Sequence, residues 1–275
     1  MGRTVVAELR ARGKTVLACG HDPESCEATW DVTQADGPTT SEIPHTIVHA
    51  AARRASIDED KRDEALWDVN VAGTARVVEW GLQNEVKQIV VISGALVYGS
   101  WTEPRKEDDE PNAALAGYYA LSKWASEQIA LAACKEKCEL AILRLSSLYG
   151  AAYKQGLIRH FLAQARDDGR IRVDPPLDDA FDLLHLNDAA ATVANAVEFS
   201  AKGLWNVGSG GVHSLLEIAE TCASVAGATV EQSRRRPRRA ARILNWVDDA
   251  PARAELGHRN GVPLIDGVRE IASST

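Results

Sequence analysis

The feature that most restricts the fold of this chain is a regular alternation of short apolar runs and amphipathic segments. Residues 89–92 are apolar without interruption, and similar short runs lie within residues 45–52 and 139–150. A strand has this composition when helices cover both faces of a parallel sheet. Between the runs, residues 63–86 and 117–133 space their apolar side chains as helices do. The alternation predicts an α/β fold with a parallel sheet between two layers of helices.

One of the predicted helices carries a tyrosine and a lysine four residues apart. Tyr119 and Lys123 are expected on the same helix face, because residues four apart are neighbours there. A free tyrosine has a pKa of about 10, and a nearby ammonium group lowers it by favouring the phenolate. Such a pair can accept the proton of a substrate hydroxyl while hydride leaves the same carbon. A buried tyrosine beside a lysine that extends to solvent would have the same spacing, so the pair alone does not decide the function.

Composition narrows the class of protein. With 275 residues, 45% of them hydrophobic, the chain can bury a sizeable core. A net charge of −8 argues against nucleic acid or a membrane surface as a partner. We find no run typical of a membrane span or a signal peptide and expect a cytoplasmic protein. The cysteines are scattered and odd in number, which favours free thiols over a metal site: Cys19, Cys26, Cys134, Cys138 and Cys222.

A series of short motifs runs through almost the whole chain. They are HAAA (49–52), NVAGT (70–74), SGALVYG (93–99), YALSK (119–123), LRLSSLYG (143–150), FDLLHLNDAA (181–190), WNVGSG (205–210), SLLEIA (214–219) and AELGH (254–258). In this order they resemble the extended short-chain dehydrogenases/reductases, in particular the NAD-dependent epimerase/dehydratase family that acts on nucleotide sugars. The resemblance implies a Rossmann-like, doubly wound parallel sheet in residues 1–150. It also implies a smaller substrate-binding region in residues 151–275, with some segments returning to the main sheet.

The resemblance further implies roles for individual residues. Tyr119 is the implied acid/base, and Lys123 the group that lowers its pKa and holds the nicotinamide ribose. The family's third catalytic group, a Ser or Thr, falls on Gly94, so Ser93 is the candidate third member. The residues implied to contact the substrate are Gly94, Ser147, His185 and Arg239, the last within a basic run (233–242) that could equally be a solvated loop. Ser147 and Phe181 replace polar family residues, which permits a smaller or less polar substrate, or an enzyme with reduced activity.

The resemblance also implies a dinucleotide cofactor, NAD or NADP. Asp22, after the second strand of the family fold, could hold the ribose hydroxyls of NAD, whereas His21 leaves room for the additional phosphate of NADP. We favour NAD. The implied cofactor-binding residues are Gly2, His21, Asp22, Asp31, Val32, Ala50, Ala51, Ala52, Asn70, Tyr119 and Lys123.

The beginning of the chain departs from the family pattern. Such folds place the dinucleotide pyrophosphate on a glycine-rich turn between the first strand and the first helix. Here the first helix and the next strand, residues 15–19, are recognisable, but the strand before them and most of the turn are missing; Gly2 is the last glycine of the turn. We consider a start site assigned too far downstream, a truncated relic, and a sheet completed in another way. We favour the first.

These observations predict an NAD(P)-dependent oxidoreductase, epimerase or dehydratase. The expected reaction is at a hydroxyl-bearing carbon of a sugar or nucleotide sugar. The alternatives are a non-catalytic dinucleotide- or ligand-binding relic of the family, and a partner-binding relic that binds no dinucleotide. We expect a homodimer through the helices within 66–83 and 119–133, with Trp67, Trp80 and Trp124 as apolar anchors. Burial of these tryptophans inside the monomer is the competing explanation.

Overall fold

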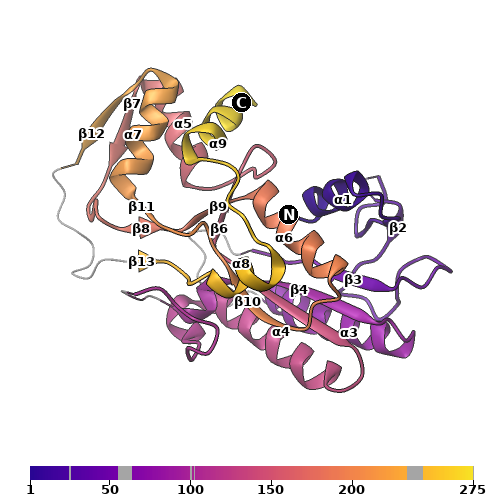
Figure 1. Cartoon of the computed structure of the whole chain (residues 1–275). Helices are drawn as coiled ribbons and strands as arrows, with labels where there is room; N and C mark the ends of the chain where they lie inside the picture. The colour runs from indigo at the N-terminus through magenta and orange to yellow at the C-terminus, as the bar shows by residue number, and fades with distance from the viewer. Residues whose placement is uncertain (25, 55–63, 100, 102, 234–243, 275) are drawn as a thin grey trace.

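A four-stranded parallel sheet forms the centre of the computed structural model, which describes residues 1–24, 26–54, 64–99, 101, 103–233 and 244–274. Its strand order is β10–β5–β4–β3. The strands are β3 (Thr46–His49), β4 (Gln88–Gly94), β5 (Glu139–Leu145) and β10 (Gly203–Val207). Helices α3 (Gly73–Gln83) and α4 (Tyr118–Cys134) cover one face, and α1 (Gly2–Ala11) and α6 (Leu186–Glu198) the other (Figure 1). The predicted α/β fold is confirmed.

The central strands are buried as their sequence predicts. All residues of β4 except Gly94 are buried, because β3 and β5 flank the strand and helices cover both of its faces. Its apolar side chains alternate between two cores. Val90 and Ile92 pack with α1 and α6, whereas Ile89 and Val91 pack with α3 and α4. A continuous apolar run is what such a strand requires.

The long helix predicted for residues 63–86 is interrupted. It consists of α2 (Glu64–Trp67), a π-helical turn η1 (Asp68–Ala72) and α3. The π turn contains Asn70, whose side chain bonds outside its own helix. Just after it, a Cβ on Gly73 would lie 2.8 Å from Val32, so the absence of a side chain permits close packing. Periodicity in the sequence does not reveal such an interruption.

The predicted strand at residues 139–150 is divided between two sheets. After β5, the short β6 (Ser147–Tyr149) pairs in parallel with β9 (Leu183–His185). Just before β9 in the chain, β8 (Ala180–Phe181) lies between β11 (His213–Ser214) and β13 (Leu244–Asn245) in a sheet of its own. The remaining short helices are η2 (Ala95–Tyr98), η3 (Ala113–Ala116) and α8 (Ala250–Leu256).

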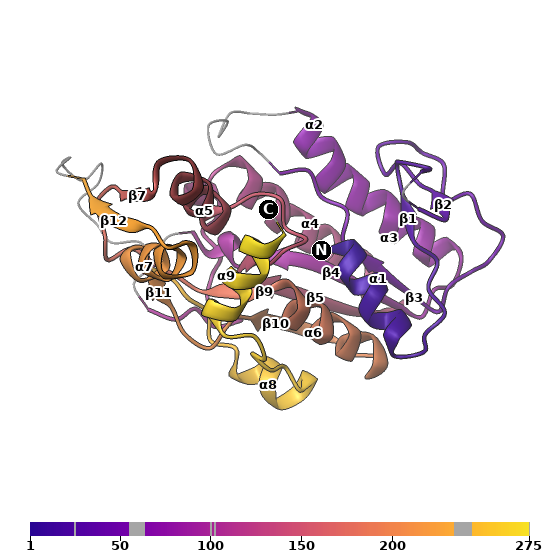
Figure 2. The same cartoon turned by 90° about the horizontal axis from the view of Figure 1, so that it is seen from above.

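The C-terminal half builds a second core away from the main sheet (Figures 1 and 2). It consists of α5 (Leu157–Asp168), β7 (Arg170–Val173), α7 (Leu215–Ala226), β12 (Thr229–Gln232) and α9 (Leu264–Ser273). Helix α7 begins with a capping box, in which Ser214 and Glu217 bond to each other's backbone N–H. The assignment of residues 151–275 to substrate binding stays a prediction. Among the helices of the described residues, none combines the length and apolarity needed to cross a membrane.

The N-terminal strands form a sheet of their own. Of the expected strand at residues 15–19, only the end pairs: β1 (Cys19–Gly20) pairs in parallel with β2 (Ala28–Thr29). Among the described residues, no strand pairs with the other edge of β1, and β3 pairs with β4 alone. Helix α1 packs over the same core that Val16 and Val48 border. The sheet is therefore in two parts, and each part has one open edge beside the place where a doubly wound fold has its first strand.

An engineered N-terminal extension that supplies an apolar strand and a glycine-rich turn should stabilise this protein. New backbone hydrogen bonds to the open edges of β1 and β3 should raise the melting temperature by about 5–10 °C. The turn should also increase dinucleotide affinity. The measurement is a paired thermal melt and calorimetric titration of the chain with and without the extension. Tight dinucleotide binding by the unextended chain, with no gain from the extension, would contradict the expectation.

Candidate active site

The candidate residues gather where the parallel strands end. Strands β3, β4 and β5 run in the same direction and finish at His49, Gly94 and Leu145. Their carboxyl ends therefore meet at one edge of the sheet, which is where open α/β sheets bind ligands. Residues 50–52 directly follow β3, and Ser147 lies just beyond β5. Helix α4 packs against β4 and β5.

Helix α4 presents a phenol, an ammonium group and a carboxylate at steps of four residues: Tyr119, Lys123 and Glu127. The Lys123 side chain is 5% exposed, and its Nζ donates a hydrogen bond to the Ile92 carbonyl at 2.7 Å. Burial lowers the pKa of Lys123 to about 8, although the Glu127 carboxylate acts in the opposite direction. Sequence analysis did not assign Glu127. The sequence feature that could have identified it is its position four residues after Lys123, on the same helix face.

The pKa of Tyr119 is raised, whereas the sequence predicted that it would be lowered. The residue is half-buried, and burial raises the pKa of its phenol. The charge that lowers this pKa is the guanidinium of Arg54, not the ammonium of Lys123 as the spacing predicted. Among the described residues, no hydrogen bond forms to the Tyr119 hydroxyl group.

Ser93 is not placed as the third catalytic hydroxyl. Its side chain is buried and donates a short hydrogen bond to the Glu127 carboxylate. That carboxylate also accepts bonds from Arg144, with Nη2 at 2.7 Å and Nε at 3.1 and 3.2 Å from its oxygens. The physical reason is strand geometry: neighbouring side chains on β4 point to opposite faces, and Ser93 points toward α4. Ser93 therefore holds Glu127 in place.

The polar network continues away from the active site. Arg144 Nη1 donates to the Tyr98 hydroxyl at 2.7 Å, and that hydroxyl donates to Asn206 Oδ1 at 2.8 Å. The Asn206 N–H in turn donates to Glu107. Every buried charge in this series thus has a partner, which the low dielectric of the interior requires.

His49 and Asn70 form hydrogen bonds to residues next to the candidate site. The His49 ring bonds to Thr74 Oγ1 at 3.0 Å, and burial, with the nearby Lys123 charge, lowers its pKa to about 3. The imidazole is therefore neutral at ordinary pH. The Asn70 amide bonds to both backbone groups of Arg53 and donates to Ser122 Oγ at 2.9 Å. Asn70 thus joins the loop after β3 to the turn of α4 that carries Tyr119.

The predicted substrate residues divide into two groups. Ser147 lines a cavity of about 40 Å³ with Ala95, Leu96, Trp101, Leu145, Ser146 and Asn245, directly beyond Gly94. His185 instead is 2% exposed, and its Nε2 bonds to Glu270 Oε2 at 2.9 Å, so it links α9 to the start of α6 rather than facing a substrate. Arg239 lies outside the described residues.

The family profile for the NAD dependent epimerase/dehydratase family matches residues 1–208. The chain belongs to this family. Two relatives are dTDP-4-dehydro-6-deoxyglucose reductase of Escherichia coli and dTDP-glucose 4,6-dehydratase of Streptomyces niveus. Each is 27% identical, over 241 and 229 residues. The alignments cover 83% of this chain and 74% of the reductase, and 82% of this chain and 68% of the dehydratase.

Solved structures of similar fold extend over nearly the whole chain. UDP-glucose 4-epimerase of Thermus thermophilus, in complex with NAD, superposes with a TM-score of 0.83 at 23% identity. MoeE5, in complex with UDP-glucuronic acid and NAD, superposes with a TM-score of 0.84 at 22% identity. Both alignments cover 99% of this chain and 94% of the other. At these identities the likeness concerns the fold.

The residues that the family resemblance assigns to a dinucleotide lie in two groups. In the first, Tyr119 and Lys123 are on α4, and the small Ala51 and Ala52 directly follow β3 and are exposed. In the second, the family-assigned residues follow β1 and β2: His21, Asp22, Asp31 and Val32. Asp31 accepts hydrogen bonds from the N–H and hydroxyl of Thr33, which lower the pKa of its carboxyl and keep it charged.

Gly2 lies where the resembled family has the last glycine of its phosphate-binding turn. It is the first residue of α1, and a Cβ built on it would lie 3.8 Å from the Ala50 side chain. Gly2 therefore places the beginning of α1 against the end of β3.

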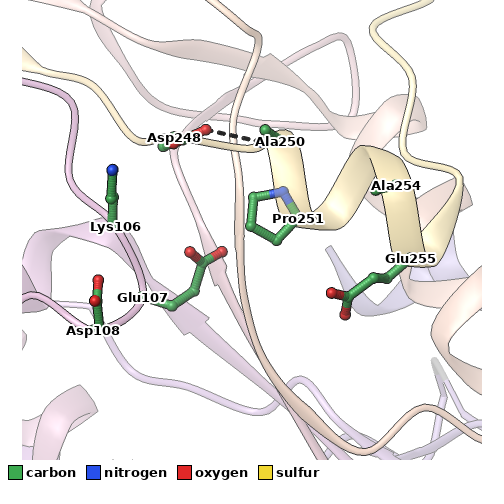
Figure 3. Close-up of a pocket in the computed structure, with 8 residues that line it drawn as sticks. All are labelled: Lys106, Glu107, Asp108, Asp248, Ala250, Pro251, Ala254 and Glu255. Atoms are coloured by element: carbon green, nitrogen blue, oxygen red, sulfur yellow. Dashed lines mark hydrogen bonds between the residues drawn. The ribbon is translucent and has the colours of Figure 1, made fainter.

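A larger hollow of about 530 Å³ lies elsewhere, between residues 106–108 and α8 (Figure 3). Its charged lining is mostly acidic: Lys106, Glu107, Asp108, Asp248 and Glu255. Asp248 Oδ1 accepts a hydrogen bond from the Ala250 N–H at the start of α8, and Glu107 is bound by Asn206. None of the catalytic candidates lines this hollow, so it is not part of the candidate active site.

The Glu127–Arg144 pair should dominate the stability of this region. Arg144→Met should reduce the free energy of unfolding by about 3–5 kcal/mol, because it leaves the Glu127 carboxylate buried and uncompensated. Denaturant titration of the variant and the wild type measures the difference. The matched control is Arg170→Met, since the Arg170–Glu231 pair is about half exposed and should change stability by less than about 1 kcal/mol. Equal losses in the two variants would contradict the prediction.

Proposed function

We propose that this protein is an NAD(P)-dependent enzyme that acts on a hydroxyl-bearing carbon of a nucleotide-linked sugar. The observation that carries the proposal is the placement of Tyr119 and Lys123 on α4, at the carboxyl edge of the sheet. The family assignment supports the reaction class, since the reductase and dehydratase relatives are named for sugar-nucleotide substrates.

In this proposal the residues of the chain bind and orient the substrate and the cofactor, and they transfer one proton. The Tyr119 hydroxyl group exchanges the proton of the reacting sugar hydroxyl. Lys123, held by the Ile92 carbonyl, provides a positive charge and a donor toward the nicotinamide ribose. The bound dinucleotide supplies the hydride acceptor and donor. Ala51 and Ala52 leave room for it, and the cavity at Ser147 receives part of the substrate.

We propose NAD as the cofactor in preference to NADP. Asp22 and Asp31 follow the ends of β1 and β2, and the carboxyl of Asp31 has a lowered pKa. Two carboxylates at this place suit ribose hydroxyl groups and repel an additional phosphate. His21 is the residue that would favour NADP.

Tyr119→Phe should remove nearly all turnover while leaving cofactor affinity almost unchanged. The ring still packs against its neighbours, but the transferable proton is gone. Lys123→Ala should reduce both turnover and affinity, because its role includes the ribose. Steady-state kinetics on a panel of nucleotide sugars and calorimetric NAD titration measure the two effects. Wild-type turnover in Tyr119→Phe would show that the catalytic assignment is wrong.

A second candidate function, binding without turnover, is favoured by the missing third hydroxyl, because Gly94 has no side chain and Ser93 is bound to Glu127. The companion variant Gly94→Ser distinguishes the two. Gly94 has extended backbone (φ −147°), and a Cβ there would lie 3.7 Å from the Leu145 carbonyl oxygen, so serine fits without strain. Activity that stays level or rises supports the enzyme, whereas the appearance of activity only in the variant supports the relic.

We also propose that two copies associate through the face formed by α3 and α4. The three tryptophans expected there are half-buried: Trp67 contacts Tyr118, Trp80 contacts Trp30, and Trp124 packs against a small core that includes Val97 and Tyr98 of η2. Leu131 on α4 is 44% exposed, which suits an apolar contact. Light scattering at micromolar concentration should give the mass of a dimer, and Leu131→Glu should shift it toward the monomer. A monomeric mass for the wild type would exclude this assembly.

A further inference from the structure

The small cavity at the carboxyl edge of the sheet has an apolar side and a polar side. Gly94 and Leu145 are paired where β4 and β5 end, and the cavity lies directly beyond them. Its apolar side comes from η2 and the loop after it: Ala95, Leu96 and Trp101. Its polar side comes from the chain around β6 and from β13: Ser146, Ser147 and Asn245. Lys123 reaches the same region, since its ammonium group bonds to the Ile92 carbonyl, two residues before Gly94.

The apolar side offers a ligand no free polar side-chain group. Leu96 is 44% exposed, whereas the other three residues of η2 are buried. The polar atom of Trp101 is already engaged, because its Nε1 donates to the Trp246 carbonyl at 2.7 Å. A hydroxyl group placed against this side would lose its water partners without gaining new ones, which is unfavourable. A methyl group placed there would bury apolar surface, which is favourable.

The position of Leu96 is fixed by its buried neighbours. The Tyr98 hydroxyl group, at the end of η2, accepts from Arg144 Nη1 at 2.7 Å and donates to Asn206 Oδ1 at 2.8 Å. The residues of η2 other than Leu96 belong to an apolar cluster, against which Trp124 of α4 packs. This short helix is therefore held against α4 and the sheet, and Leu96 lines the cavity instead of joining the core.

The opposite side keeps two polar groups available. Ser146 Oγ donates to Asp182 Oδ1 at 3.0 Å and is engaged there. The hydroxyl group of Ser147 and the amide of Asn245, in contrast, form no hydrogen bond within the residues that the structure describes. Backbone bonds hold both residues, because the Ser147 N–H donates to the Asp182 carbonyl at 3.0 Å and the Asp182 N–H donates to the Asn245 carbonyl at 2.8 Å. Polar atoms of a ligand can therefore be bound on this side.

We propose that the cavity receives a methyl-terminated substituent of the sugar and that Leu96 selects it. This rests on the proposed function and narrows its substrate class to nucleotide sugars that carry such a methyl group. The methyl group can belong to a deoxy sugar, at its terminal carbon, or to an N-acetyl group. The cavity volume of about 40 Å³ suits a small substituent, since one water molecule takes about 30 Å³ in the liquid. Leu96 is thus a specificity-determining residue.

The test compares nucleotide sugars that differ only at this substituent. One pair is UDP-glucose and its 6-deoxy analogue, and the other is UDP-N-acetylglucosamine and its N-formyl analogue, each also as the dTDP derivative. Calorimetric titration of the full-length protein with saturating NAD gives the affinities, and steady-state kinetics give kcat/KM. The methyl-bearing member of one pair should be preferred by about 10–100-fold. The pair that shows the preference identifies the source of the methyl group.

Variants of Leu96 separate selection by its side chain from selection elsewhere in the site. Leu96→Asn keeps a similar size but presents an amide, so the methyl preference should fall to about threefold or less. Leu96→Met should retain the preference. The matched control is Leu115→Asn, because Leu115 is an exposed leucine on the neighbouring η3 that does not line the cavity. Melting temperatures of the variants should equal that of the wild type, since both side chains are exposed.

The outcomes distinguish this proposal from the proposed reaction. A methyl preference in binding without turnover would contradict the reaction and support the role of Leu96. Turnover with equal kcat/KM and equal affinity within both pairs would support the reaction and overturn the proposal. An unchanged preference in Leu96→Asn, an equal loss in Leu115→Asn, or failure of all these nucleotide sugars to bind would also overturn it.

Discussion

The buried ion pair between Glu127 and Arg144 ties helix α4 to strand β5 directly beneath the candidate active site. Two charges inside a protein are costly unless both are paired and fully hydrogen-bonded. Here Arg144 donates to the carboxylate through Nε and Nη2, Ser93 donates its hydroxyl group, and the Tyr98 hydroxyl accepts from the remaining nitrogen of the guanidinium. Because these bonds are directional, they hold α4 in one position against β4 and β5. The positions of Lys123 and Tyr119 on the next turns of the same helix follow from that anchor.

The charges around Lys123 and Tyr119 are balanced in a different way. Lys123 lies between a carboxylate, Glu127, and the ring of His49, whose pKa of about 3 keeps it neutral. A protonated His49 would repel the ammonium group of Lys123, so its burial protects the charge of the lysine. Burial raises the pKa of Tyr119, and the charge of Arg54 acts in the opposite direction. The pKa values of Tyr119 and Lys123 therefore respond to different neighbours, although both residues lie on one helix.

The division of the sheet marks the boundary between the two ends of the expected dinucleotide site. The expected nicotinamide end lies at the ends of β3 and β4 and on α4, and the buried network joins α4 to β4 and β5. The adenosine end rests on β1 and β2, which have few strand contacts and are connected to the rest mainly through α1 and the loop at Val32. An open β3 edge separates them in the described residues.

The sequence by itself determined the layers of the fold, because periodicity and apolar runs report which faces of each element are buried. It also determined that Tyr119 and Lys123 lie on the same face of one helix, since a step of four residues leaves little freedom. It could not decide what happens between elements. The bond from Ser93 to Glu127, the burial of His185 against Glu270 and the π turn at Asn70 join residues that are up to 85 positions apart or depend on such contacts. Only the tertiary structure decided these features, because the direction of a side chain on a strand or loop depends on partners that no local pattern specifies.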